Sequence, residues 1–165
     1  MSQDTAATRS VILRARGSLK KRDRGKVRKV PFVELFGGRL QGVVSSGSDP
    51  KRVYVNFFEA GTGDYYCSTN NNRRCGGLRG GSCKHLKSLL DNALDQYGSE
   101  RVIRYLRLDT DETQLNAWAI QSLLRGSEKK TPANEVFSRF LNYLRYVELA
   151  GHAGPVHEMS FFITG

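Results

Sequence analysis

The sequence lacks any apolar run long enough to cross a membrane, and no hydrophobic signal segment is present at its N-terminus. We therefore expect an intracellular protein without a membrane partner, cytoplasmic or, in a eukaryotic cell, nuclear. Apolar residues make up 39% of the 165 positions and aromatic residues 10%. This is enough to build a core, so global disorder is disfavoured. The length suits one ordinary domain, or a compact module with a small helical appendix.

Recognisable catalytic motifs are also missing from the chain. It has no nucleophile elbow, no glycine-rich phosphate-binding motif of the required form and no carboxylate pair that sequence alone identifies as a site. The glycine pairs at 76–77 and 80–81 lie between cysteines, and we interpret them as giving that loop flexibility. We expect a protein that is not an enzyme.

Cysteine is scarce, and its three copies are clustered. Cys67, Cys75 and Cys83 are the only cysteines, and His85 follows the last of them by two positions. Three thiolates and one imidazole are a complete ligand set for a closed, tetrahedral zinc site. The sequence therefore predicts one structural zinc ion as the cofactor.

Two alternatives to a zinc site remain open. A disulfide would leave one of the three cysteines unpaired, and we expect no oxidising compartment, so this alternative is the weaker one. The other is a set of three buried thiols beside a surface histidine, because free cysteines often pack as small apolar residues. Cys75 and Cys83 lie among Arg, Gly, Ser and Asn residues, which offer few apolar contacts. We interpret His152 and His157 as surface histidines, since the cysteine cluster already supplies a full ligand set.

This stretch resembles the SWIM zinc finger, whose pattern is C-x-C, a variable gap, and C-x-H. Cys67 matches the first ligand of that family, and Cys83 and His85 match the closing pair. The second family cysteine would fall at position 69, where this chain has Thr69. Cys75 would take that role from further along the loop.

The resemblance covers residues 50–97 and leaves the last third of the chain outside it. It implies a small metal-stabilised module that binds DNA or proteins and is not itself catalytic. SWIM-like modules are also associated with larger assemblies, including helicase-type and MoxR-type ATPases. The resemblance thus supports two expectations, a nucleic-acid-binding module and a protein-interaction adaptor subunit.

Positive charge is concentrated in two places. The formal net charge is +10, and most of it lies between Arg9 and Val30, with a second, acid-free group around the cysteine loop. Such groups are typical of a polyanionic partner, most simply nucleic acid, whose phosphates they neutralise. The residues expected to contact phosphates are Arg14, Arg16, Lys20, Lys21, Arg22, Arg24, Lys26, Arg28, Lys29, Arg73, Arg74, Arg79, Lys84 and Lys87.

The expected binding has little base specificity, because phosphate contacts position a backbone without distinguishing its sequence. Tyr54, Tyr65 and Tyr66 are candidates for stacking on bases. Each of these tyrosines can equally pack across strands. For the basic groups, the alternative is a solvated loop that only aids solubility.

We expect a disordered tail at 1–8, and the sequence from there to residue 67 predicts a small antiparallel sheet. Val53, Val55 and Phe57 alternate with Arg52, Tyr54 and Asn56, which is the two-residue period of a strand. Turn residues separate this strand from its neighbours. The expected strand segments are 27–36, 39–44, 51–59 and 65–67.

A helix is predicted after the cysteine loop, with Ser82 as its cap and Gly98 after its end. Its apolar face consists of Leu86, Leu89, Leu90, Ala93, Leu94 and Tyr97, which follow helical spacing. Two further strands are expected, at 101–108 and at 159–164. Two further helices are expected between them. The first runs from a capping box at Asp109 and Glu112 to about 125, and the second from Thr131 and Pro132 to about 150.

Together these elements predict an α+β fold. A small antiparallel sheet with a zinc-bound loop and helix spans residues 9–98, and a C-terminal helical pair lies within residues 99–165. This C-terminal region is either packed on the first part or appended to it. The pair either completes the core or presents an apolar docking face to a partner.

Overall fold

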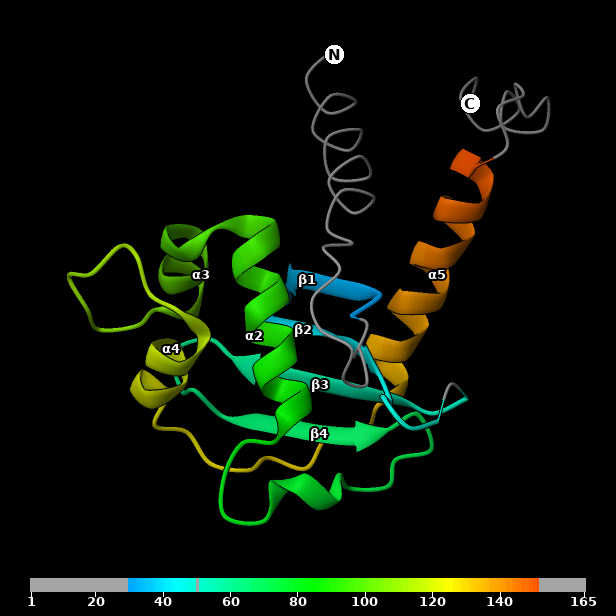
Figure 1. The fold of residues 1–165 in the computed structure, drawn as a ribbon, viewed down its shortest axis with the longest axis horizontal. Helices are drawn as coiled ribbons and strands as arrows, with labels where there is room; N and C mark the ends of the chain where they lie inside the picture. The colour runs from blue at the N-terminus through cyan, green and yellow to red at the C-terminus, as the bar shows by residue number, and fades with distance from the viewer. Residues whose placement is uncertain (1–29, 50, 152–165) are drawn as a thin grey trace.

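The computed structural model describes residues 30–49 and 51–151 and has the predicted α+β fold (Figure 1). Within these residues, four antiparallel strands lie side by side in sequence order. Gly37 and Gly38 have φ values of 58° and 76°, the left-handed region that glycine adopts without steric cost in a tight hairpin turn. The strands are β1 (Phe32–Phe36), β2 (Arg39–Ser45), β3 (Val53–Glu59) and β4 (Tyr65–Thr69).

The strand register gives the sheet two different faces. On the first, which we call the metal face, β2 to β4 place Leu40, Phe58 and Cys67 beneath helix α2 (Lys84–Tyr97). The opposite face, which we call the aromatic face, packs Phe32, Val43 and Val55 against helix α5 (Asn134–Gly151). Figure 1 shows α2 crossing in front of the sheet.

Helix α2 confirms the predicted apolar face and its end at Gly98. Four of its side chains are fully buried, and the Gly98 N–H donates to the Leu94 carbonyl oxygen over 2.9 Å. The cap prediction was wrong. Cys83 occupies the N-cap without a side-chain hydrogen bond, whereas the Ser82 hydroxyl accepts a hydrogen bond from the Gln121 amide. The four fully buried side chains of α2 are those of Leu86, Leu89, Leu90 and Ala93.

Residues 101–108 were predicted as a strand, but most of them form helix α3 (Ser99–Leu106). The buried residues Val102, Ile103 and Leu106 fit helical spacing as well as a short strand, so the apolar pattern alone was ambiguous. The helix ends at Arg107, which has a left-handed φ of 57°.

The next two helices begin later than the sequence suggested. Helix α4 (Ala117–Leu123) starts after Asn116, whose side-chain oxygen accepts a hydrogen bond from the Ala119 N–H over 2.9 Å. The capping box predicted at 109–112 is therefore not the start of this helix. Helix α5 begins at Asn134, and the Thr131 hydroxyl donates to the Lys129 carbonyl instead of capping the helix.

Helices α4 and α5 do not form a clear helical pair. Helix α4 packs against α2, whereas α5 packs against β2 on the aromatic face. The predicted terminal strand at 159–164, the tail at 1–8, the two C-terminal histidines and the basic segment at 14–29 lie outside the described residues. In the part of the chain that the structure describes, no helix has the length and apolarity needed to cross a membrane.

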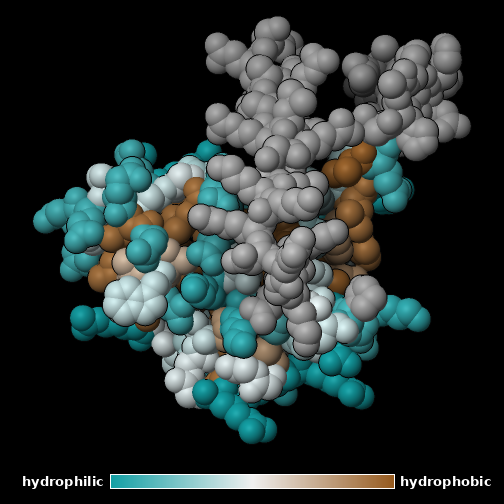
Figure 2. All heavy atoms as spheres, in the orientation of Figure 1, coloured by the Kyte–Doolittle hydropathy of each residue, from teal (hydrophilic) through white to brown (hydrophobic). Residues whose placement is uncertain are grey.

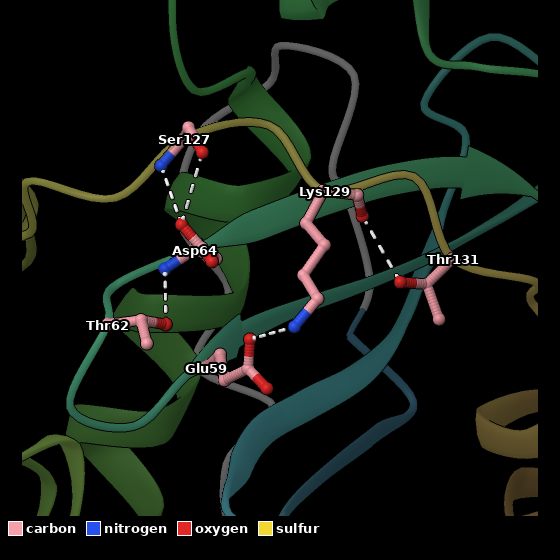
Figure 3. Close-up of polar contacts among 6 residues, drawn as sticks. All are labelled: Glu59, Thr62, Asp64, Ser127, Lys129 and Thr131. Atoms are coloured by element: carbon pink, nitrogen blue, oxygen red, sulfur yellow. Dashed lines mark hydrogen bonds and ion pairs between the residues drawn. The ribbon is translucent and has the colours of Figure 1, made fainter.

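The segment between α4 and α5 runs along the outer edge of β4. The Tyr65 N–H donates to the Ser127 carbonyl over 3.0 Å, and the Lys129 N–H donates to the Tyr65 carbonyl over 2.9 Å. Figure 3 shows two side-chain contacts beside them: Asp64 accepts from the Ser127 N–H at 2.8 Å, and Lys129 pairs with Glu59 at 2.8 Å. The backbone hydrogen bond from Ser127 lowers the pKa of Asp64 below its usual value. These bonds attach the C-terminal region to the strand that delivers Cys67.

Candidate metal centre

Four side chains from three separate segments converge at one end of the metal face. Cys67 lies in β4, Cys75 precedes the short 3-10 helix η1 (Gly76–Leu78), and Cys83 and His85 lie at the start of α2. The three cysteines are buried and the histidine is half-buried. Their ligand atoms all lie within 4.8 Å of one another.

The distances match those between ligands of a tetrahedral metal ion. The His85 Nδ1 atom lies 3.8 Å from Cys67 Sγ, 3.4 Å from Cys75 Sγ and 3.8 Å from Cys83 Sγ. Zinc bonds to sulfur and nitrogen at tetrahedral angles would separate these atoms by about 3.6 Å. The group can therefore hold one metal ion, with all four positions filled by protein.

The loop between Cys67 and Cys83 wraps closely around the sulfur atoms. The Cys75 N–H donates to the Cys67 carbonyl over 3.0 Å, and the Gly77 N–H points to Cys75 Sγ at 3.4 Å. A Cβ atom at Gly77 would lie only 3.0 Å from the Cys83 Cβ. Glycine at this position thus lets the backbone approach the cluster. Leu78 is the loop's buried apolar side chain apart from the cysteines.

The three thiols do not share negative charge evenly. Hydrogen bonds with Cys75 and Cys83, together with burial, raise the pKa of the Cys67 thiol. Hydrogen bonds from Cys67 and Cys83 lower the pKa of Cys75. Without a metal ion, the expected arrangement is one thiolate, Cys75, that accepts hydrogen bonds from two thiols. A bound cation lets all three carry charge, so metal binding must release protons.

The orientation of His85 is the one that a fourth metal ligand would have. Its Nδ1 atom faces all three sulfurs, and the Tyr54 ring stacks on its imidazole at a centroid distance of 3.7 Å and an angle of 15°. The three cysteines form no disulfide.

The tyrosines considered for base stacking have protein partners in the structure. Tyr54 covers His85, Tyr66 is buried, and Tyr65 contacts the Phe58 ring at a centroid distance of 6.3 Å. These contacts fit the packing alternative for all three residues.

The structure separates the predicted phosphate contacts into three groups. Four of them are exposed and lie on the cysteine loop or in the first turn of α2: Arg73, Arg79, Lys84 and Lys87. Arg74 is also exposed, but its guanidinium pairs with both Glu128 oxygens at 2.5 Å and donates to the Leu78 carbonyl at 3.2 Å. Arg74 therefore connects the loop to the segment that follows α4. The nine basic residues from 14 to 29 lie outside the described residues.

Two functional neighbours of the centre carried no signal in the sequence. The stacking of Tyr54 on His85 depends on the β3–β4 register, and the Arg74–Glu128 pair joins residues 54 positions apart. Comparisons with family models, curated proteins and solved structures gave no match for this chain.

Proposed function

We propose that this protein is a non-catalytic nucleic-acid-binding module stabilised by one structural zinc ion. The zinc ligands are Cys67, Cys75, Cys83 and His85. Three soft thiolates and an imidazole favour zinc over the hard cations calcium and magnesium, which prefer oxygen ligands. The closed ligand set leaves no position for a reactive water, so the metal has a structural role.

The observation that carries the proposal is the group of exposed cations on the segments that supply the ligands. Arg73 and Arg79 lie on the cysteine loop, and Lys84 and Lys87 lie in the first turn of α2. That turn contains no acidic residue. Cations at a helix N-terminus oppose the helix dipole and destabilise the helix, whereas a bound phosphate would be favoured by the dipole and the lysines together.

The test is nucleic-acid affinity as a function of salt, measured with a short DNA duplex and with single-stranded DNA and RNA of the same length. The account predicts a steep fall in affinity as salt rises, because each neutralised phosphate releases counterions. It also predicts similar affinity for unrelated sequences, since phosphate contacts carry no base information. A flat salt dependence with all three probes would remove the proposal.

A matched pair of double variants locates the contact. Arg79→Glu with Lys87→Glu reverses two charges beside the centre without touching a metal ligand. Arg107→Glu with Arg145→Glu makes the same charge change at two other exposed positions. The first pair is expected to lower the salt slope by about 2, one for each lost phosphate contact, and the second pair to leave it nearly unchanged. Equal effects of the two double variants on the salt slope would show that binding depends only on the net charge of the protein.

An adaptor subunit of a larger assembly, for example with an ATPase partner, is the second candidate. Exposed large apolar side chains on the described surface favour it, because such groups often mark docking sites. Figure 2 shows apolar atoms gathered along α5. The exposed large apolar side chains are Phe36 in β1, Trp118 in α4, and Leu141 and Tyr146 in α5. Purification from nuclease-treated lysate separates the candidates: a stoichiometric protein that survives nuclease supports the adaptor, and co-purified nucleic acid supports the binding module.

A further inference from the structure

One polar side chain in the core has no partner. Asn56 in β3 is 0% exposed, and neither its amide nitrogen Nδ2 nor its amide oxygen Oδ1 has a hydrogen-bond partner among the described residues. Burying an amide without partners is costly, and an apolar side chain of similar size would avoid that cost. The presence of asparagine here therefore calls for a hydrogen-bond partner.

The register of the sheet places Asn56 directly opposite the first cysteine of the metal centre. Asn56 pairs with Cys67 across β3 and β4 and with Gly42 across β2 and β3, all on the metal face. On the Gly42 side, the space for a side chain is already taken, because a Cβ there would lie 2.7 Å from Leu89 Cδ1. Cys67 is therefore the directly opposite residue that carries a side chain, and its sulfur can accept a hydrogen bond.

The backbone hydrogen bonds show that Asn56 and Cys67 form the closer of the two kinds of antiparallel pair. The Cys67 carbonyl accepts from the Cys75 N–H, and the N–H groups of Tyr65 and Thr69 donate to Ser127 and Arg73. All three strand residues thus direct their backbone groups away from β3. Cys67 and Asn56 consequently form a non-hydrogen-bonded antiparallel pair, in which the side chains approach more closely than in the alternating pairs.

We propose that Asn56 is a positioning residue of the metal centre, whose Nδ2–H group donates a hydrogen bond to the Cys67 thiolate when the metal is bound. This inference rests on the proposed zinc site. Three thiolates and one Zn²⁺ leave a net charge of −1 in a largely buried group. An amide donor from β3 would spread that charge and fix the orientation of the sulfur, as outer partners do in other metal sites.

The test compares two variants of nearly equal shape that differ in their ability to donate. Asn56→Thr keeps a hydroxyl donor and Asn56→Val does not, while both are β-branched residues suited to a strand. Zinc affinity is measured in full-length protein by competition with a chromophoric chelator. The sulfur-to-metal charge-transfer bands are measured after substitution with Co²⁺. Gln41→Leu is the control, since Gln41 is a buried amide on the opposite face of the sheet, bonded to Glu34.

We expect Asn56→Val to bind zinc about 10- to 100-fold more weakly than the native chain, with Asn56→Thr between the two. The charge-transfer bands of Asn56→Val should move to lower energy, because a thiolate that accepts no hydrogen bond is more easily oxidised. Gln41→Leu should match the native protein in both measurements.

Equal affinities and identical cobalt spectra for the native, Thr and Val chains would overturn this inference, and would point to a buried water as the partner of Asn56. That result would leave the zinc site intact. Failure of the native chain to bind zinc or cobalt would instead remove the proposed zinc site, and with it this inference. If Asn56→Val does not fold, Asn56→Ala, which also removes the donor, takes its place, and native-like zinc affinity and cobalt spectra for that variant would overturn the inference.

Discussion

The two faces of the sheet are held by different means. On the aromatic face, Phe32 contacts the rings of Phe140 and Tyr143 at centroid distances of 5.9 and 5.4 Å, and Arg139 of α5 pairs with Glu34 of β1. On the metal face, the leucines of α2 pack on the strands, but the loop that joins β4 to α2 contributes Leu78 as its buried apolar side chain besides cysteine.

This difference is the reason why we propose a metal ion on one face alone. Ring contacts and buried apolar area suffice to hold α5 on β2 and β1. The glycine- and arginine-rich loop buries little apolar surface to offset its ordering entropy, and the proposed ligand bonds would close it. Five substitutions test this contrast, in order of decreasing expected effect.

Cys83→Ser should have the largest effect, because it removes a ligand at the start of α2. We expect loss of stoichiometric zinc and a fall in the free energy of unfolding of more than about 4 kcal/mol, since binding and folding of such loops are coupled. Metal analysis and thermal unfolding measure the two effects. Ser82→Ala, the neighbouring substitution, should retain zinc. A Cys83→Ser protein with native stability would contradict the contrast between the faces.

Phe140→Ala should destabilise the aromatic face without affecting the metal. Phe140 is buried between Phe32 and Phe137, so its truncation should cost about 3 kcal/mol. Urea unfolding gives this value, and metal analysis of the folded fraction should still find one zinc per chain. Zinc loss at urea concentrations where the variant remains folded would show that the two faces are not independent.

Gly42→Ala should cost about 1–3 kcal/mol, because its methyl group would displace Leu89 of α2 and the β1 backbone. Gly76→Ala in the cysteine loop is the matched control, since a Cβ there meets nothing within 4 Å. Chemical unfolding of both variants measures the difference. A larger effect at Gly76 than at Gly42 would mean that the loop, and not the α2 contact, limits stability.

Glu34→Gln should cost about 1 kcal/mol, since a half-buried, two-bond contact with Arg139 is stronger than an exposed ion pair. The Arg139 side chain donates to the two Glu34 oxygens at 2.5 and 2.7 Å and also covers the Phe36 ring. Unfolding at low and at high salt should show a smaller difference between native and variant at high salt, because the interaction is partly screened. Equal stability at low salt would remove the ion pair from the account.

Glu128→Gln should have the smallest effect at neutral pH. The hydrogen bond from Arg74 lowers the pKa of Glu128 below its usual value. The pair therefore stabilises the fold above the unfolded-state pKa, and this contribution is lost as pH falls through the folded-state pKa. Thermal unfolding between neutral and acid pH should show a shallower decline for the variant. If the stabilities of the native chain and the variant fell in parallel with pH, the Arg74–Glu128 pair would not stabilise the loop.

Local patterns predicted the parts of the fold that depend on local contacts. The α2 leucines and the alternation of Val53, Val55 and Phe57 were sufficient for one helix and one strand. The three cysteines and the histidine were recognisable because soft ligands in a polar loop have few other roles. The prediction for residues 101–108 was wrong because a short apolar cluster fits either period. The predicted starts of the helices that begin at 117 and 134 were wrong because several residues offered equivalent caps.

Features that depend on contacts distant in sequence were beyond prediction. Arg74 resembled a phosphate contact until the fold brought Glu128 to it. The unpartnered amide of Asn56 is meaningful only once the β3–β4 register places it opposite Cys67. These residues carry long-range information that no local motif contains.

Native mass spectrometry of the purified chain, with and without a strong chelator, tests the central claim most directly. The account predicts one zinc ion per chain, held by three deprotonated thiols, and a broad high-charge distribution of an unfolded loop region once the zinc is removed. A metal-free chain with an unchanged, compact charge distribution in chelator would contradict it.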